Sequence, residues 1–134
     1  MSTKVKLYTL ENIFRKCSLV EFAFVFGSAK TGIILNGSDL DIAVYFSRKP
    51  KIMELASLRA DIQVKTQFDN IDLITLNDAS PILRFEALSG NRLFSRDRVK
   101  EAVFTSLSAR EFEDETGMLN SVIIQYRKTL DKKL

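Results

Sequence analysis

The segment Glu21–Phe26, which reads EFAFVF, is apolar on both of the faces that an extended chain presents. Successive side chains of a strand point to opposite faces of a sheet, so a strand of this composition has to be covered on both sides. We therefore expect a central strand, in a sheet that carries packed helices.

A second strand is predicted over Asp39–Phe46, and its two faces differ. One face is wholly apolar, whereas the other begins with two acids: Leu40, Ile42, Val44 and Phe46 against Asp39, Asp41, Ala43 and Tyr45. Such a division suits a strand with one face toward the core and one face that binds metal.

The other elements follow from periodicity and breaker residues. Two further strands are expected over Asn70–Leu76 and Asn91–Ser95. Helices are expected over Leu7–Ser18, Ser28–Thr31, Ile52–Gln67, Ile82–Leu88 and Asp97 to about Leu130, the last one interrupted at Gly117. This order indicates one α+β domain, residues 1–134, in which a small mixed β-sheet is flanked by α-helices and followed by a long C-terminal helical segment.

Composition restricts the chemistry and the cellular location. The chain has no histidine, which removes Ser-His triads, His-ligated zinc and His general bases. Its single cysteine, Cys17, cannot form an internal disulfide, so a cytoplasmic location is expected. No apolar run reaches the ~18 residues of a membrane span, and the N-terminus lacks a signal-peptide pattern. The net charge of +3 suits a phosphate-rich ligand without requiring a nucleic acid.

Three acids are the candidate catalytic residues and metal ligands: Asp39, Asp41 and Asp72. Asp72 interrupts the apolar strand that follows next, and consecutive strands are neighbours in roughly two cases of three. Converging carboxylates repel each other without a cation, and Mg²⁺ prefers oxygen ligands. Two Mg²⁺ ions ~4 Å apart could activate an attacking oxygen and steady a leaving pyrophosphate. Asp72 could also accept the proton of the nucleophile.

Gly27 and Ser28 stand at the end of the first strand, ten residues before Asp39. Backbone N–H groups and a hydroxyl at such a turn can bind phosphate, and the N-terminus of a short helix adds a partial positive charge. Ser28 would hold the outer phosphates of a nucleotide. The predicted reaction is nucleotidyl transfer, in which an acceptor hydroxyl attacks the α-phosphorus and pyrophosphate leaves.

The Asp-x-Asp pair alone does not identify an activity. It recurs in metal-dependent glycosyltransferases and in haloacid-dehalogenase-type phosphatases, and it also occurs in solvated turns. The phosphatases place their acids at the C-terminal end of a strand, whereas Asp39 and Asp41 open one. The combination with Gly27-Ser28 and a later strand aspartate is much more specific.

At these residues the chain resembles the minimal nucleotidyltransferases (MNT) of the DNA polymerase beta superfamily. Their signature is G-S-x10-D-x-D, and GSAKTGIILNGSDLD meets it at Gly27, Ser28, Asp39 and Asp41. Asp72 matches the third carboxylate of the family. The stretch LNDASPILRFEALSGNRLFSRD is similar to the subgroup paired with HEPN-domain proteins in toxin–antitoxin modules.

The resemblance implies a nucleotidyltransferase fold, ATP as substrate, Mg²⁺, and a role as antitoxin. It further implies that AMP is added to a tyrosine of a partner HEPN ribonuclease, which silences it. One departure concerns phosphate binding: the family commonly has Arg four residues after the glycine, where this chain has Thr31. Lys30 is adjacent and could reach the triphosphate instead, although Lys offers a point charge rather than a planar fork.

The acceptor and the partner surface remain open in the sequence. An apolar stripe at helical spacing can pack on the sheet or form a partner or homodimer surface: Leu119, Val122, Ile123, Tyr126 and Leu130. Arg84 can point to the site or lie on a helix surface. The alternatives to a protein adenylyltransferase are an adenylyltransferase that modifies small molecules such as antibiotics, and a non-catalytic antitoxin that acts by binding alone.

Overall fold

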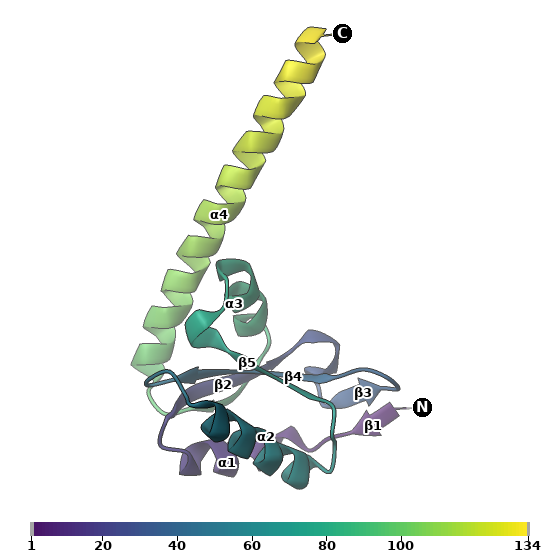
Figure 1. The fold of residues 1–134 in the computed structure, drawn as a ribbon, viewed down its shortest axis with the longest axis vertical. Coiled ribbons are helices and arrows are strands. Elements are labelled where there is room, and N and C mark those ends of the chain that lie inside the picture. The colour runs from purple at the N-terminus through teal and green to yellow at the C-terminus, as the bar shows by residue number, and fades with distance from the viewer. Residues whose placement is uncertain (1, 134) are drawn as a thin grey trace.

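The computed structural model describes residues 2–133, including all of their side chains except those of residues 119 and 131–133. A four-stranded sheet in the order β5-β4-β2-β6 lies between two layers of helices (Figure 1). Its strands are β2 (Val20–Phe26), β4 (Leu40–Phe46), β5 (Ile71–Thr75) and β6 (Asn91–Ser95). One face is covered by α1 (Glu11–Lys16) and α2 (Ile52–Thr66), and the other by α3 (Pro81–Leu88) and the start of α4 (Arg98–Lys133). The predicted α+β architecture is confirmed.

The central strand is β2, and each of its residues is buried. Its side chains enter two separate apolar clusters. The cluster shared with α1 and α2 contains Val25, Ile42 and Ile62, and the cluster shared with α3 contains Phe24 and Leu76. Both faces of the segment EFAFVF are therefore used as core, which accounts for its lack of a polar face.

The pairing of three neighbouring strands, β2, β4 and β5, fixes which residues meet at the end of the sheet next to Gly27. β2 runs antiparallel to β4, with Phe26 opposite Asp41. β4 runs parallel to β5, with Asp41 opposite Asp72. The parallel connection needs a crossover, which α2 supplies. Because side chains alternate along a strand, this register places Asp41 on the α3 face, together with Ala43 and Tyr45.

A second, two-stranded sheet was not predicted. β1 (Ser2–Lys4) pairs antiparallel with β3 (Ile33–Leu35), and the backbone N–H of Val5 donates to the carbonyl oxygen of Gly32 at 2.7 Å. Each strand has three residues, too few to show a period of two. β3 lies inside the ten-residue spacer between Ser28 and Asp39, so part of this spacer forms a strand of the second sheet.

Three predicted boundaries were wrong. The helix expected over Leu7–Ser18 is a 3₁₀ turn, Leu7–Leu10, followed by the six-residue α1. The helix expected over Ser28–Thr31 is a 3₁₀ turn, η2 (Gly27–Ala29). Gly117 does not interrupt α4, since a glycine inside a long helix costs only about 1 kcal/mol and does not break the hydrogen-bond ladder.

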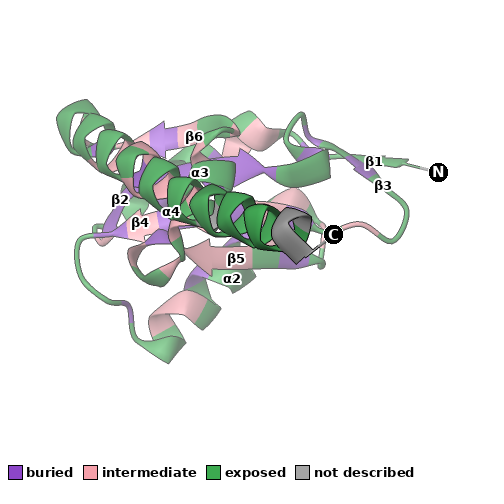
Figure 2. Ribbon diagram, turned by 90° about the horizontal axis from the view of Figure 1, so that it is seen from above, coloured by how far each residue is buried: buried purple, intermediate pink, exposed green. Residues whose placement is uncertain are grey.

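Helix α4 extends far beyond the sheet (Figure 1), and its projecting part is exposed (Figure 2). The part of the predicted apolar stripe whose side chains are described is exposed, so packing of this stripe on the sheet is wrong. The side chain of Leu119 lies outside the described residues. None of the helices in residues 2–133 is both long and apolar enough to cross a membrane.

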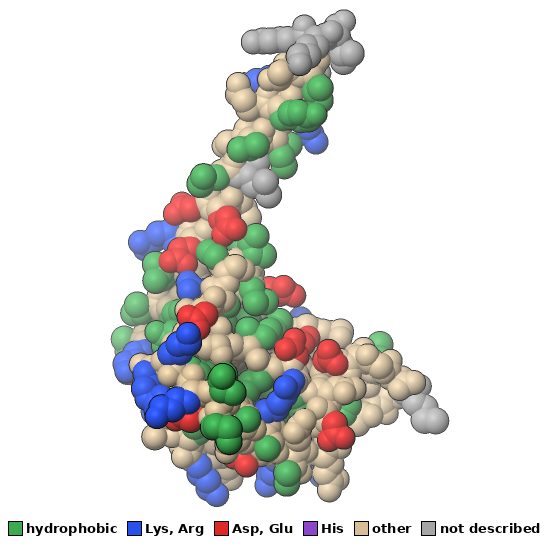
Figure 3. Space-filling view, viewed as in Figure 1, with side chains coloured by type: hydrophobic (Ala, Val, Ile, Leu, Met, Phe, Trp, Pro, Cys, Tyr) green, Lys and Arg blue, Asp and Glu red, His purple; other side chains and the backbone are tan. Residues whose placement is uncertain are grey.

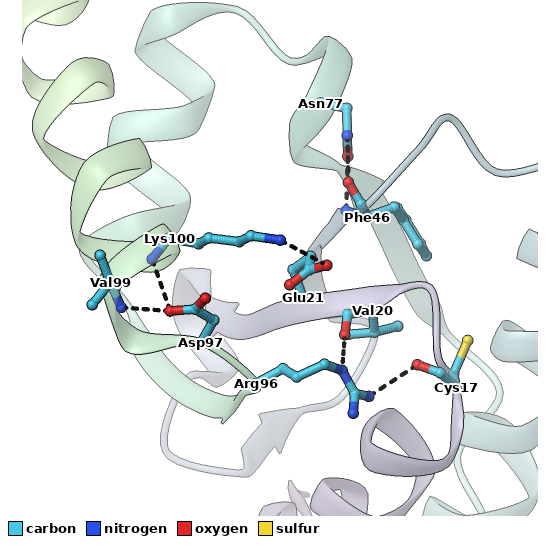
Figure 4. A network of polar contacts seen from close by, with 9 residues as sticks. All are labelled: Cys17, Val20, Glu21, Phe46, Asn77, Arg96, Asp97, Val99 and Lys100. Atoms are coloured by element: carbon cyan, nitrogen blue, oxygen red, sulfur yellow. Dashed lines mark hydrogen bonds and ion pairs between the residues drawn. The ribbon is translucent and has the colours of Figure 1, made fainter.

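Polar contacts hold the start of α4 to the sheet (Figure 4). Arg96 donates from Nε to the carbonyl oxygen of Val20 at 2.9 Å and from Nη2 to that of Cys17 at 3.2 Å. Lys100 forms an ion pair with the buried Glu21 of β2 at 3.5 Å. These contacts join α4 to the N-terminal end of β2, opposite to the end that carries Gly27.

A further ion pair joins β6 to the first turn of α4. Arg92 donates from Nε to Glu101 Oε1 at 2.6 Å and from Nη2 to Glu101 Oε2. These hydrogen bonds lower the pKa of the Glu101 carboxyl, although burial acts in the opposite direction. The stabilisation is therefore present above the unfolded pKa of about 4.3 and is lost as the pH falls through the folded pKa.

We expect Glu101→Gln to lower the free energy of unfolding by about 1–2 kcal/mol at pH 7, because it removes the charge from a buried hydrogen-bonded pair whose other member is partly exposed. The deficit should shrink as the pH falls below about 4.3, where the wild-type carboxyl also becomes protonated. Urea unfolding between pH 3 and 7 measures it. A loss of unfolding free energy that does not change with pH would contradict the role given to the ionised Glu101 carboxyl.

Candidate nucleotide and metal site

Gly27 directly follows the last residue of β2, Phe26, and has a conformation that only glycine adopts without strain. Its φ is +75°, and a Cβ at this position would collide with the carboxylate of Asp41. The collision follows from the strand pairing, which places Phe26 directly opposite Asp41. The glycine of the motif thus allows the backbone turn to approach the carboxylate of the neighbouring strand closely.

Asp41 is half-buried, and its surroundings are negatively charged. Its pKa is raised, first by burial, then by repulsion from Asp72 and Asp39, by a hydrogen bond with the Asp72 carboxyl, and by the charge of Glu86. Every one of these causes penalises the ionised form. The site therefore attracts a cation or a proton.

Asp39 and Asp72 are both exposed. Asp39 was expected within the strand, but β4 begins at Leu40, so Asp39 lies in the preceding loop. Its charge still reaches Asp41. Among the described residues no three acidic, His or Cys side chains already enclose a metal position. The oxygen atoms of these carboxylates are the donors that Mg²⁺ prefers.

Ser28 is exposed and lies directly next to Gly27, in η2. A three-residue turn has too few aligned peptide dipoles to act as a helix terminus, so the predicted helix-dipole contribution is wrong. What remains is the Ser28 hydroxyl and the N–H groups of the first turn, which have no intrahelical partners.

Lys30 and Thr31 are exposed and line a hollow of about 400 Å³ beside the turn. Its walls come from the N-terminal 3₁₀ turn, the end of β2 and the strand β6: Leu7, Tyr8, Glu11, Val25, Asn91, Arg92 and Leu93. The structure thus places Lys30 next to Gly27-Ser28, on a hollow whose walls do not include the three aspartates.

Two features of the site were missed by sequence reasoning. Glu86 of α3 adds a fourth negative charge at Asp41. Asn91 donates from Nδ2 to the carbonyl oxygen of Lys30 at 2.9 Å, which ties β6 to the glycine turn across 61 positions of sequence. Neither belongs to a local motif, so only the packing of α3 and β6 against β2 reveals them.

Arg84 has a structural role. It donates to the carbonyl oxygen of Leu76 at 3.2 Å and pairs with Glu111 of α4 at 2.8 Å. Its guanidinium also lies over the ring of Phe104, 5.3 Å from the centroid. It therefore braces α3 against α4 and is not free to bind a nucleotide.

A family model matches the part of the chain that carries the glycine turn and the carboxylates. The model, described as "Polymerase beta, Nucleotidyltransferase", covers residues 8–99. The chain belongs to this family. The matched range contains Gly27, Ser28, Asp39, Asp41 and Asp72, and ends where α4 begins.

Solved structures of nucleotidyltransferase relatives have the same fold. A chain from a toxin–antitoxin complex with AMP-PNP is 18% identical with a TM-score of 0.73, covering 92% of this chain and 99% of the other. A chain from a tri-AMPylated Shewanella oneidensis HEPN toxin in complex with an MNT antitoxin is 15% identical with a TM-score of 0.68, covering 90% and 95%. No curated protein matches the chain in sequence.

The repulsion at Asp41 predicts that Asp41→Asn stabilises the fold. Because the pKa of Asp41 is raised in the folded state, its ionisation destabilises the protein at pH 7, and the effect vanishes below the unfolded pKa of about 3.9. In a chelating buffer at pH 7 we expect the substitution to add about 0.5–1 kcal/mol to the free energy of unfolding. Added Mg²⁺ should raise the Tm of the wild type but not that of the variant.

The matched control is Asp61→Asn on α2, which makes the same change on the opposite face of the sheet. It should alter neither the stability nor the response to Mg²⁺. An Asp41→Asn variant that is less stable than the wild type at pH 7 in chelator would contradict the account of this site.

Proposed function

We propose that the chain is a protein adenylyltransferase that transfers AMP from ATP to a tyrosine hydroxyl of a partner HEPN ribonuclease toxin, and that it is the antitoxin of that pair. The observation that carries the proposal is the alignment of Phe26, Asp41 and Asp72 across three neighbouring strands, with Gly27 directly after Phe26 and close to the Asp41 carboxylate. A backbone turn that can bind phosphate lies directly against carboxylates that can bind metal.

In this proposal Gly27 and Ser28 hold the outer phosphates, and Lys30 adds a positive charge beside them. Asp39, Asp41 and Asp72 hold Mg²⁺, with two ions expected. The bound Mg²⁺ neutralises the charge that develops on the triphosphate oxygens.

The transfer step is a substitution at the α-phosphorus. The tyrosine oxygen forms a bond to the α-phosphorus as the bond to the pyrophosphate oxygen breaks, and pyrophosphate leaves. A tyrosine hydroxyl has an ordinary pKa of about 10, so a base has to take its proton. We assign this role to Asp72, which is exposed, rather than to Asp41, which is half-buried.

The choice of acceptor is supported by the structural relatives. One is described as a complex with a tri-AMPylated HEPN toxin, and another as a toxin–antitoxin complex with AMP-PNP. Both are below 20% identity, so the acceptor of this chain is a matter for experiment.

The test is intact-mass spectrometry of the HEPN protein encoded beside this chain, after incubation with the chain, ATP and Mg²⁺. We expect a mass increase of one or more AMP units on a tyrosine, and loss of ribonuclease activity. With the double substitution Asp39→Asn and Asp41→Asn, the complex should still form while the mass increase disappears.

Asp61→Asn again serves as the control and should transfer AMP normally. An unmodified toxin that is nevertheless inhibited by both the wild type and the double variant would show that the chain acts by binding alone. An acceptor-dependent release of pyrophosphate with an aminoglycoside-like small molecule, and none with the toxin, would favour the small-molecule enzyme.

Thr31 in place of the usual Arg leaves Lys30 as the only Lys or Arg between Gly27 and Asp39. We expect Lys30→Gln to weaken ATP binding by roughly 10-fold, the size of one lost charge-assisted hydrogen bond. Thr31→Arg should tighten it. Isothermal titration with ATP and Mg²⁺ measures both changes, and an unaltered affinity in Lys30→Gln would remove Lys30 from the site.

A further inference from the structure

The outer half of α4, residues 113–130, leaves its described apolar side chains exposed. Figure 3 shows hydrophobic side chains spaced along this projecting segment. Ile123 is 41% exposed, Leu130 43% and Tyr126 65%. Isolated helices gain little stability from their own hydrogen bonds, and most helical stability comes from packing of an apolar face. The projecting segment therefore has the surface expected of a helix with a partner.

The apolar stripe continues the face with which α4 packs on α3. Phe112 stacks on Phe85 of α3 with ring centroids 4.1 Å apart, and Thr116 is half-buried one turn further on. The same face then passes through positions 119, 123, 126 and 130. From 112 onward the spacing alternates between four and three residues, which is the seam of a two-helix coiled coil.

This seam is its own complement when two copies run in opposite directions about residue 121. Phe112 of one copy then lies opposite Leu130 of the other, and Thr116 lies opposite Tyr126. Position 119 lies opposite Ile123. Each of these layers contains at least one large side chain. Phe85 of α3 is still 39% exposed and adds apolar surface beside Phe112.

The charges of the projecting segment are arranged about the same centre. Most charges before the centre are acidic and most after it are basic: Glu113, Asp114 and Glu115 before, Arg127, Lys128, Lys132 and Lys133 after, with Arg110 and Asp131 as the exceptions and Glu111 already paired with Arg84. Antiparallel pairing sets Glu113 of one copy beside Arg127 of the other, twice in each dimer. Parallel pairing would set acid beside acid and base beside base. Both residues are exposed, and neither has an ion-pair partner in the described part of the chain.

We propose that the projecting segment binds a second copy of this chain as an antiparallel pair of α4 helices centred near residue 121. Two independent patterns, the apolar seam and the charge blocks, are arranged about this same residue. An antiparallel pair of identical helices requires this arrangement. The paired stretch from 112 to 130 is about 28 Å long at 1.5 Å per residue. This is less than three heptads, so we expect a weak, reversible dimer whose fraction rises with protein concentration.

The experiment is sedimentation equilibrium of the full chain, without toxin or nucleotide, over a concentration series. The wild type should show a monomer–dimer equilibrium. Glu113→Arg alone, or Arg127→Glu alone, should weaken dimerisation by about 10-fold, since each creates two like-charge contacts. The double variant Glu113→Arg with Arg127→Glu should recover the wild-type dissociation constant, since it exchanges the partners of each ion pair.

Two matched pairs of variants control for other effects. Asp114→Arg makes the same change of charge on the outer side of the helix and should leave dimerisation unchanged. Ile123→Asn should abolish dimerisation, whereas Ile124→Asn, one residue outside the seam, should not. Circular dichroism should show a folded chain in every case, because all of these side chains are exposed in a single copy.

A wild-type chain that stays monomeric at high concentration would overturn the proposal. A charge-exchanged double variant that dimerises no better than its single variants would also overturn the proposal. That result would show that residue 113 of one copy does not contact residue 127 of the other. A chain that is monomeric alone and engages α4 only when the HEPN protein is added would assign the segment to that partner instead. None of these outcomes depends on whether AMP is transferred.

Discussion

The register of three neighbouring strands is the constraint on which the site depends. Phe26 lies opposite Asp41, and Asp41 lies opposite Asp72, so the glycine turn and two carboxylates form one row across β2, β4 and β5. A slip of one residue in β4 would send the Asp41 side chain to the α2 face, among Leu40, Ile42 and Val44. The burial of both faces of β2 makes such a slip costly, because it would also move an apolar row into contact with the wrong layer.

The site is held together against electrostatic repulsion. Asp41 is half-buried beside Asp72 and Asp39, and Glu86 adds to the negative field. The rest of the fold supplies the compensating stability: an apolar core on each side of the sheet, the Arg92–Glu101 pair, and the Arg96 contacts that fix the start of α4. A local arrangement that is unfavourable without a ligand is common at functional sites, where the ligand removes the conflict.

Much of this arrangement could be predicted from the sequence. The segment EFAFVF and the two unlike faces of Asp39–Phe46 predicted the central strands, and Asn91–Ser95 was predicted with its observed bounds. The β1–β3 sheet could not be predicted, since three-residue strands carry no periodicity. The course of α4 could not be predicted either. The apolar spacing of Ile123, Tyr126 and Leu130 is the same for a helix that packs on a sheet and for a helix that packs on another chain. The contributions of Glu86 and Asn91 depend on long-range packing that no local pattern records.

The most direct test of the site is a crystal of the chain grown with Mn²⁺ and a non-hydrolysable ATP analogue, examined by anomalous scattering. The account predicts at least one manganese peak about 2 Å from carboxylate oxygens of Asp39 and Asp41, with Asp72 also coordinating and the triphosphate against the Gly27-Ser28 turn. A manganese peak bound elsewhere, or a triphosphate bound away from that turn with Asp72 directed into solvent, would contradict it.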